Sequence, residues 1–75
     1  MQHRTISEHM EVVGSDGALV GTVDHVEDTE IKLTKSSDKS GQHHFIPLDW
    51  IASVDDKVRL TKAARDAKAE WRAAA

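Results

Sequence analysis

The chain has no cysteine, and this absence removes several kinds of chemistry at once. Without thiols it forms no disulfide, no thiolate zinc site and no covalent intermediate on a cysteine. The 75 residues also contain only three aromatic side chains, which are Phe45, Trp50 and Trp71. Three scattered rings are too few to stack successive bases of single-stranded RNA. We therefore expect the rings to serve the core or an interface with a partner.

The sequence also has no long apolar run, and its first eight residues are mostly polar. A secretory signal or a membrane-spanning helix needs such a run, so we expect a cytoplasmic protein without membrane insertion. Thirteen acidic and ten basic side chains give a formal charge of −3, which disfavours general binding to nucleic acid. The basic residues are nevertheless concentrated near the C-terminal end of the chain: Lys57, Arg59, Lys62, Arg65, Lys68 and Arg72.

The length allows a single domain over residues 1–75, with a small core. We expect residues 1–8 to fray, residues 9–60 to form a β-barrel and residues 61–75 to form a helix. The turn at the start of this pattern is Gly14-Ser15-Asp16-Gly17. Glycines supply the positive φ of a tight turn, and Asp16 can hydrogen-bond to its own turn.

A strand from Ala18 to Val26 should follow this turn. Its apolar positions Val20, Val23 and Val26 recur every three residues, which a flat strand cannot bury on one face. We therefore predict a β-bulge or sharp bend at Gly21.

The other strands are read from alternation and from turn residues. Before the turn, residues 9–13 suit a strand with Met10 and Val12 inward. After Val26, residues 30–35 alternate cleanly, with Ile31 and Leu33 inward. Further strands are expected at 43–48, ended by Pro47, and in a hairpin of residues 53–60 around Asp55-Asp56. Between them lie a polar loop at 36–42, which we expect to be mobile, and a helical turn at 49–52 capped by Asp49.

The sequence changes character at Thr61, a good N-cap for the alanine-rich run of residues 62–75. This run has no glycine, proline or β-branched residue, so it predicts a C-terminal helix. Ala64, Ala67 and Trp71 form a narrow apolar stripe on that helix. So small a stripe holds a helix weakly, and Trp71 should dock it on the barrel or on a second subunit.

Together these elements resemble the PRC-barrel family, and more narrowly the short bacterial proteins similar to it. The resemblance rests on the turn at 14–17, on the glycine and valine pattern of residues 20–26, and on Phe45-Ile46-Pro47-Leu48 with Ile51. It implies a mainly β fold, namely a small, highly bent antiparallel barrel of about six strands followed by a helix. It also implies interaction roles without catalytic residues, and it gives Gly14, Gly17 and Gly21 structural roles. Val20, Val23, Ile46 and Ile51 would form its core.

Five histidines raise the possibility of a metal site using His25, His43 or His44, but the spacings of zinc sites are absent. No cofactor is expected. Serines and threonines lie in turns and loops, and no acid–base pair stands out, so we expect no enzyme.

The leading hypothesis is a non-enzymatic interaction or adaptor module whose partner is another protein or a second copy of the chain. Self-association would use the C-terminal helix or an exposed strand edge. Its candidate interface residues are Trp71, Arg65, Lys68, Arg72 and Trp50. The first alternative is an RNA- or ribosome-associated accessory factor that uses the basic residues from Lys57 to Arg72. A weaker alternative is a metal-responsive protein based on the histidines.

Overall fold

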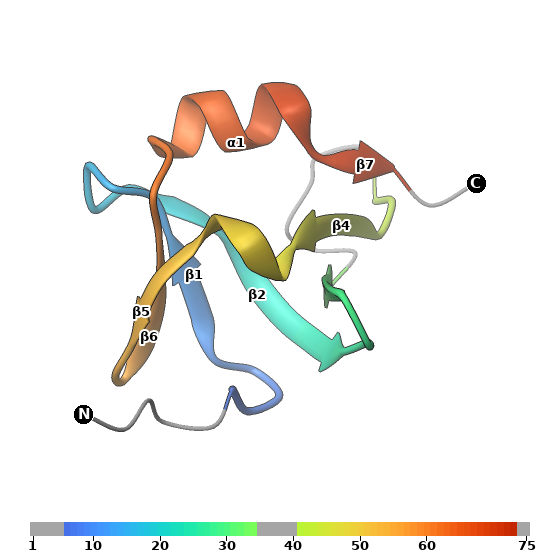
Figure 1. The fold of residues 1–75 in the computed structure, drawn as a ribbon. Coiled ribbons are helices and arrows are strands. Elements are labelled where there is room, and N and C mark those ends of the chain that lie inside the picture. The colour runs from blue at the N-terminus through green and yellow to red at the C-terminus, as the bar shows by residue number, and fades with distance from the viewer. Residues whose placement is uncertain (1–5, 35–40, 74–75) are drawn as a thin grey trace.

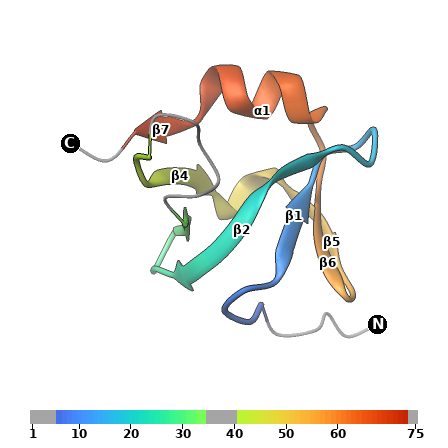
Figure 2. The same ribbon diagram turned by 180° about the vertical axis from the view of Figure 1, so that it is seen from behind.

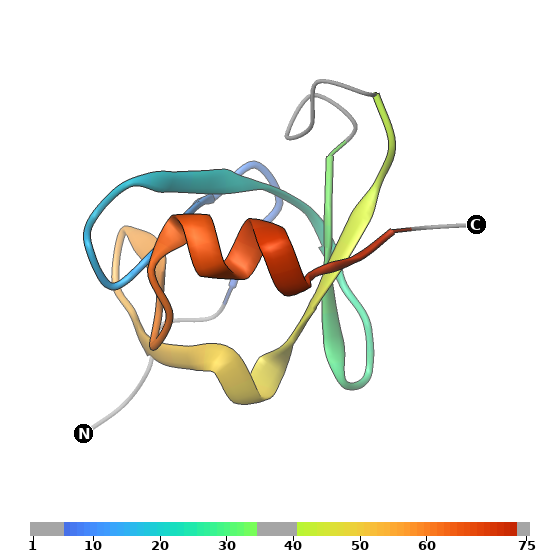
Figure 3. The same cartoon turned by 90° about the horizontal axis from the view of Figure 1, so that it is seen from above.

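A computed structural model describes residues 6–34 and 41–73 of the chain. One strongly curved sheet, a short 3-10 helix and one α-helix make up the fold, with α1 lying across one end of the curved sheet (Figures 1 and 3). The elements in chain order are β1 (Glu11–Val13), β2 (Leu19–Val26), β3 (Glu30–Leu33), β4 (His44–Pro47), η2 (Leu48–Trp50), β5 (Ile51–Val54), β6 (Lys57–Leu60), α1 (Ala64–Glu70) and β7 (Arg72–Ala73).

The sheet has seven strands in the order β5-β6-β1-β2-β3-β4-β7. The mainly β fold with a helix near its C-terminal end is therefore confirmed. Two details of the expected barrel are corrected. β1 and β6 pair in parallel, and the sheet is open because its end strands, β5 and β7, do not pair with each other. The three residues of η2 join β4 to β5. These two parts of the open sheet are therefore connected by the chain itself and not by hydrogen bonds between strands.

Two register shifts interrupt β2, and the first accounts for the burial of both Val20 and Val23, which are three residues apart. One lies opposite the Val12/Val13 step of β1, where Gly21 and Leu19 are the paired residues, and the other lies between Val23 and His25. Each shift inserts one residue into β2, so the inward face is reset. The bulge predicted at Gly21 is confirmed, and Val20 and Val23 both become buried. Val26, beyond the second shift, stays 41% exposed.

The core lies between the curved sheet and α1. Its largest fully buried side chains come from β1, β2, β3, β4 and β6: Ile31, Leu33, Ile46, Leu60, Val12, Val20, Val23 and Val58. Each such aliphatic side chain contributes about 1.5–3 kcal/mol when it leaves water. Ile51 and Met10, expected in the core, are half-buried and pack against it.

The C-terminal helix is shorter than predicted. It begins at Ala64 and ends at Glu70, after which Arg72 and Ala73 pair with β4 as β7 (Figure 2). Thr61 is not its N-cap; that position is Ala63, which makes no capping bond with its side chain. Helix propensity favoured residues 62–75, but pairing with an open strand edge satisfies the backbone of residues 72–73 instead.

Three further boundaries differ from expectation. The first strand begins at Glu11, because His9 has a φ of 68° and occupies a turn. The turn after β4 is a 3-10 helix over Leu48–Trp50, and Asp49 lies within it without capping it. The hairpin around Asp55 is confirmed, although β5 begins at Ile51. Within the loop expected at 36–42, residues 36–40 lie outside the described residues, as do residues 1–5 of the expected frayed segment.

Candidate functional site

The turn before β2 holds the start of α1. Gly14 is buried, and a Cβ there would overlap the backbone nitrogen of Ala64 and lie 2.8 Å from the carbonyl carbon of Ala63. Close approach, and not a positive φ, is therefore the reason for glycine at this position. Gly17, with a φ of 83°, is the turn residue that needs the left-handed conformation.

Asp16 connects the same turn to the helix. Its Oδ1 accepts hydrogen bonds from the backbone N–H groups of Ala64 and Ala18, each at 3.2 Å. These bonds, that of Ala64 above all, lower the pKa of the carboxyl below its ordinary value. Asp16 thus supplies, from 48 residues away, the cap that the residues preceding α1 do not provide.

Trp71 closes the other end of α1. Its backbone N–H donates to the carbonyl of Ala67, and its indole stacks on the imidazole of His44 with ring centroids 4.0 Å apart. His44 is 5% exposed, whereas Trp71 is half-buried. One part of the Trp71 ring therefore packs against His44, and the other part remains accessible to solvent.

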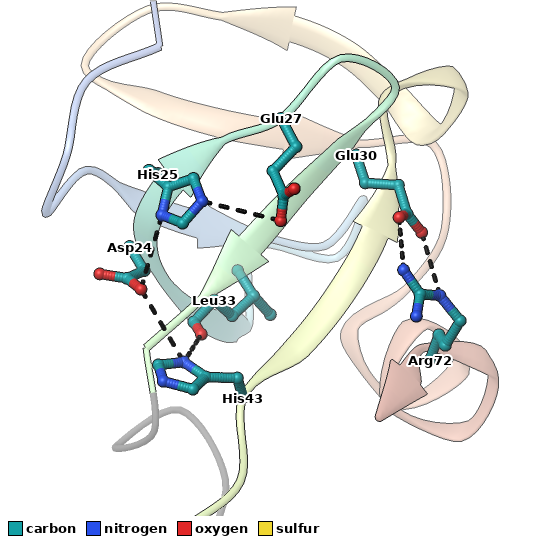
Figure 4. A network of polar contacts seen from close by, with 7 residues as sticks. All are labelled: Asp24, His25, Glu27, Glu30, Leu33, His43 and Arg72. Carbon is teal, nitrogen blue, oxygen red and sulfur yellow. Dashed lines mark hydrogen bonds and ion pairs between the residues drawn. The ribbon is translucent and has the colours of Figure 1, made fainter. Parts of the chain in front are cut away.

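Arg72 is held against the sheet. Its guanidinium makes two hydrogen bonds to the carboxylate of Glu30, at 2.5 and 3.3 Å (Figure 4). The same group lies 4.4 Å from the centroid of the Phe45 ring. The bond to Glu30 raises the pKa of Arg72 above its ordinary value. Arg72 thus fastens β7 to β3 and β4.

Trp50, the second candidate anchor, is covered by Lys62. The ammonium of Lys62 lies 4.6 Å from the Trp50 ring centroid and 2.7 Å from Oε1 of Glu70. This cation joins η2 to the last turn of α1. Trp50 is half-buried beneath it.

The basic residues of the C-terminal region are thereby divided into two groups. Lys57 pairs with Glu11 at 3.1 Å, and Arg59 pairs with Asp55 at 3.0 Å. With Lys62 and Arg72, four of the six cations are engaged in ion pairs. Arg65 and Lys68 are both exposed on α1, and within residues 6–34 and 41–73 neither makes an ion pair.

These two cations lie side by side on the helix. At about 100° per residue, Lys68, Arg65 and Ala69 follow one another around the exposed side of α1, with Asp66 and Glu70 beyond them. We call the first three residues the α1 face. The exposed side of the helix is therefore basic over one half and acidic over the other.

Two of the three candidate metal-binding histidines, His25 and His43, lie near the same carboxylate. His25 Nδ1 lies 3.7 Å and His43 Nδ1 lies 3.9 Å from Oδ2 of Asp24, while His43 Nδ1 is also 2.9 Å from the Leu33 carbonyl (Figure 4). His44 lies apart from them, against Trp71. Across the described part of the chain, no three His, Asp or Glu side chains are placed to hold one metal ion.

Neither an enclosed cavity nor a surface pocket is found among the described residues. The candidate interface is thus a helix surface, with the half-buried Trp71 directly after its last turn and the half-buried Trp50 linked to that turn through Lys62 and Glu70.

One comparison with protein families matches most of the chain. The matching model, over residues 6–68, is described as "Uncharacterized protein conserved in bacteria (DUF2171)". The chain belongs to this family. The match runs from the N-terminal residues through Lys68 and so takes in the turn at Gly14 and both cations of the α1 face, while Trp71 and Arg72 follow it. No curated protein matches the chain. No helix in residues 6–34 and 41–73 has the length and apolarity that crossing a membrane requires.

The sequence places several basic residues on and around the C-terminal helix but does not indicate which carboxylates pair with them. Glu30, Glu11 and Glu70 were not among the candidate residues, although they decide which cations are occupied. The Lys62–Glu70 pair spans eight residues and the Arg72–Glu30 pair spans 42, so neither has the short spacing by which ion pairs are recognised in a sequence.

Proposed function

We propose that this protein is a non-enzymatic interaction or adaptor module that binds an acidic surface of another protein, or of a second copy of itself, through the α1 face. The observation that carries the proposal is the presence of two adjacent exposed cations, Arg65 and Lys68, in a region whose other cations are paired. Charge complementarity steers such encounters and selects among partners. The exposed parts of Trp71 and Trp50 add apolar contact area near the last turn of the helix.

The mode of self-association follows from the same helix. Arg65 and Lys68 of one copy complement Asp66 and Glu70 of another when two α1 helices meet in antiparallel orientation. A twofold interface of this kind is the commonest among soluble oligomers.

The RNA-associated alternative has less support than this proposal. Each phosphate contact needs a cation that is free to replace counter-ions. Lys57, Arg59, Lys62 and Arg72 are engaged with carboxylates, which leaves two cations on α1 for such a role.

A relationship to PRC-barrel proteins is also proposed. It is supported by the bent sheet, by the bulge at Gly21 and by the buried positions Val20, Val23 and Ile46.

The proposal is tested by affinity capture from the native host at low and moderate salt, with and without nuclease. We expect a protein partner that survives nuclease treatment and is lost when Arg65 and Lys68 are both replaced by glutamate. The matched control is Lys32→Glu, which reverses a cation on β3, away from α1, and should leave capture unchanged. Recovery of RNA, or capture lost only after nuclease treatment, would favour the RNA-associated alternative. Sedimentation of the purified protein over a range of concentrations distinguishes a second copy from a different partner.

A further inference from the structure

The outer edge of β5 is a second surface that the proposed function does not use. β5 is the end strand of the sheet and pairs with β6 alone. Among the described residues, no backbone hydrogen bond joins Ala52, Ser53 or Val54 to a residue outside the β5–β6 hairpin. Ala52 is exposed, and its neighbours Ile51, Ser53 and Val54 are half-exposed. The strand therefore presents backbone groups that a further strand can pair with.

This edge lacks two of the devices that usually block pairing, charge and proline, although the strand has four residues and its register with β6 shifts between Ile51 and Ser53. Exposed edges in natural sheets carry charged residues or proline, or are covered by another element. Ile51–Val54 contains no charge and no proline. The opposite edge of the sheet is β7, which has two residues and carries the charged Arg72 in its pair with Glu30.

The charged residues next to β5 in the sequence lie at its two ends, and Arg59 on β6, opposite Ser53, is paired with one of them. Asp49 precedes the strand, and Asp55 and Asp56 follow it; all three are exposed. Asp55 forms an ion pair with Arg59 at 3.0 Å. The side chain of Asp56 is 72% exposed, and its distance to the Lys57 ammonium is longer, at 4.0 Å. An incoming strand therefore meets a neutral centre with carboxylates at both ends.

These carboxylates disfavour a second copy as the occupant. In a symmetric antiparallel pair of two β5 strands, the end of one copy that follows Asp49 would lie beside the end of the other copy that precedes Asp55 and Asp56. Like charges brought together at an interface are destabilising. The same carboxylates favour a strand with basic residues at its ends.

We propose that β5 binds an extended segment of a partner protein by strand addition, and that this segment has a short β-branched centre with a lysine or arginine on each side. Backbone hydrogen bonds to Ala52–Val54 provide the pairing, and Asp49 and Asp56 select the basic flanks. This surface differs from the α1 face and prefers the opposite charge. With both surfaces occupied, the protein would connect a basic segment to an acidic surface.

A peptide library tests the proposal with the full chain. The probes are heptapeptides with threonine, valine or isoleucine at the central positions and lysine at both ends, matched to the same peptides with glutamate at the ends. Binding is followed by the amide signals of the isotopically labelled protein. We expect the lysine-flanked peptides to shift the amides of Ala52–Val54. Single N-methylation along a binding peptide should abolish binding at every second position only, because alternate amides of a strand point to the same neighbour.

Two sets of variants separate the parts of the proposal. Replacing Asp49 and Asp56 with asparagine should weaken peptide binding about tenfold, as expected for two exposed ion pairs. The control Asp28→Asn, in the turn between β2 and β3, should leave it unchanged. Replacing Arg65 and Lys68 with alanine should also leave it unchanged, so failure of the β5 proposal and failure of the α1 proposal give different results.

Any of four results overturns the proposal. No lysine-flanked peptide shifts the β5 amides at millimolar concentration; the glutamate-flanked peptides bind equally well; or N-methylation has no alternating effect. A concentration-dependent dimer that protects the β5 amides would make a second copy the occupant instead, and would also overturn it.

Discussion

The indole of Trp71 stacks on the imidazole of His44, with ring centroids 4.0 Å apart and ring planes inclined by 18°. This contact joins the end of α1 to β4, and β7 begins immediately after it. The side chain that the sequence marks as an external anchor therefore also holds the helix in place. Removal of Trp71 would consequently affect folding and binding together.

Replacing Trp71 with alanine should lower the free energy of unfolding by about 2 kcal/mol, less than for a fully buried tryptophan because the ring is half-exposed. Trp71→Phe keeps a ring on His44 and should cost less than about 1 kcal/mol. Denaturant unfolding measures both. If the two variants were equally stable, the stack would have no structural role.

Gly14→Ala should destabilise the protein by about 2 kcal/mol, because a methyl group at this position must displace the backbone of Ala63 and Ala64. Gly17→Ala is the matched control. It meets no atom within 4 Å but retains a positive φ, so its cost should be about 1 kcal/mol from backbone strain alone. A larger loss at Gly17 than at Gly14 would contradict the close approach of α1 to the turn.

Acid should weaken the fold through Asp55. The backbone N–H of Lys57, and then the guanidinium of Arg59, lower the pKa of this carboxyl from 3.8 to about 2. Because the folded pKa is the lower one, the stabilisation is complete above about pH 4 and is lost as the pH falls towards 2. Asp16 acts in the same direction.

Thermal unfolding of the wild type and of Asp55→Asn checks this sign. The variant should melt below the wild type at about pH 6, and the difference should shrink as the pH falls to about 2. A constant difference between the two melting temperatures across this range would show that the charge of Asp55 does not contribute.

The parts of the fold that the sequence predicts are those with strong local patterns. Ile31 and Leu33 alternate with polar residues, and both are fully buried in β3. The three-residue period around Gly21 correctly indicates a bulge. These features depend on neighbours a few residues apart, which a sequence displays directly.

The parts that it does not predict depend on distant residues. Helix propensity extends through residues 72–73, but pairing with β4 and the Glu30–Arg72 bonds place those residues in the sheet. The parallel pairing of β1 with β6 leaves no local mark in either strand. For the same reason the sequence indicates six basic residues near the C-terminal end, while only the fold shows that Arg65 and Lys68 are the two without an ion-pair partner among the described residues.

The most direct test of the interaction function is the dissociation constant of the captured protein partner for the wild type and for the chain with Arg65 and Lys68 both replaced by alanine. We predict that binding weakens about tenfold, the usual effect of removing two exposed ion pairs, and that the melting temperature changes little because both side chains are exposed. Equal dissociation constants for the two proteins would contradict the account.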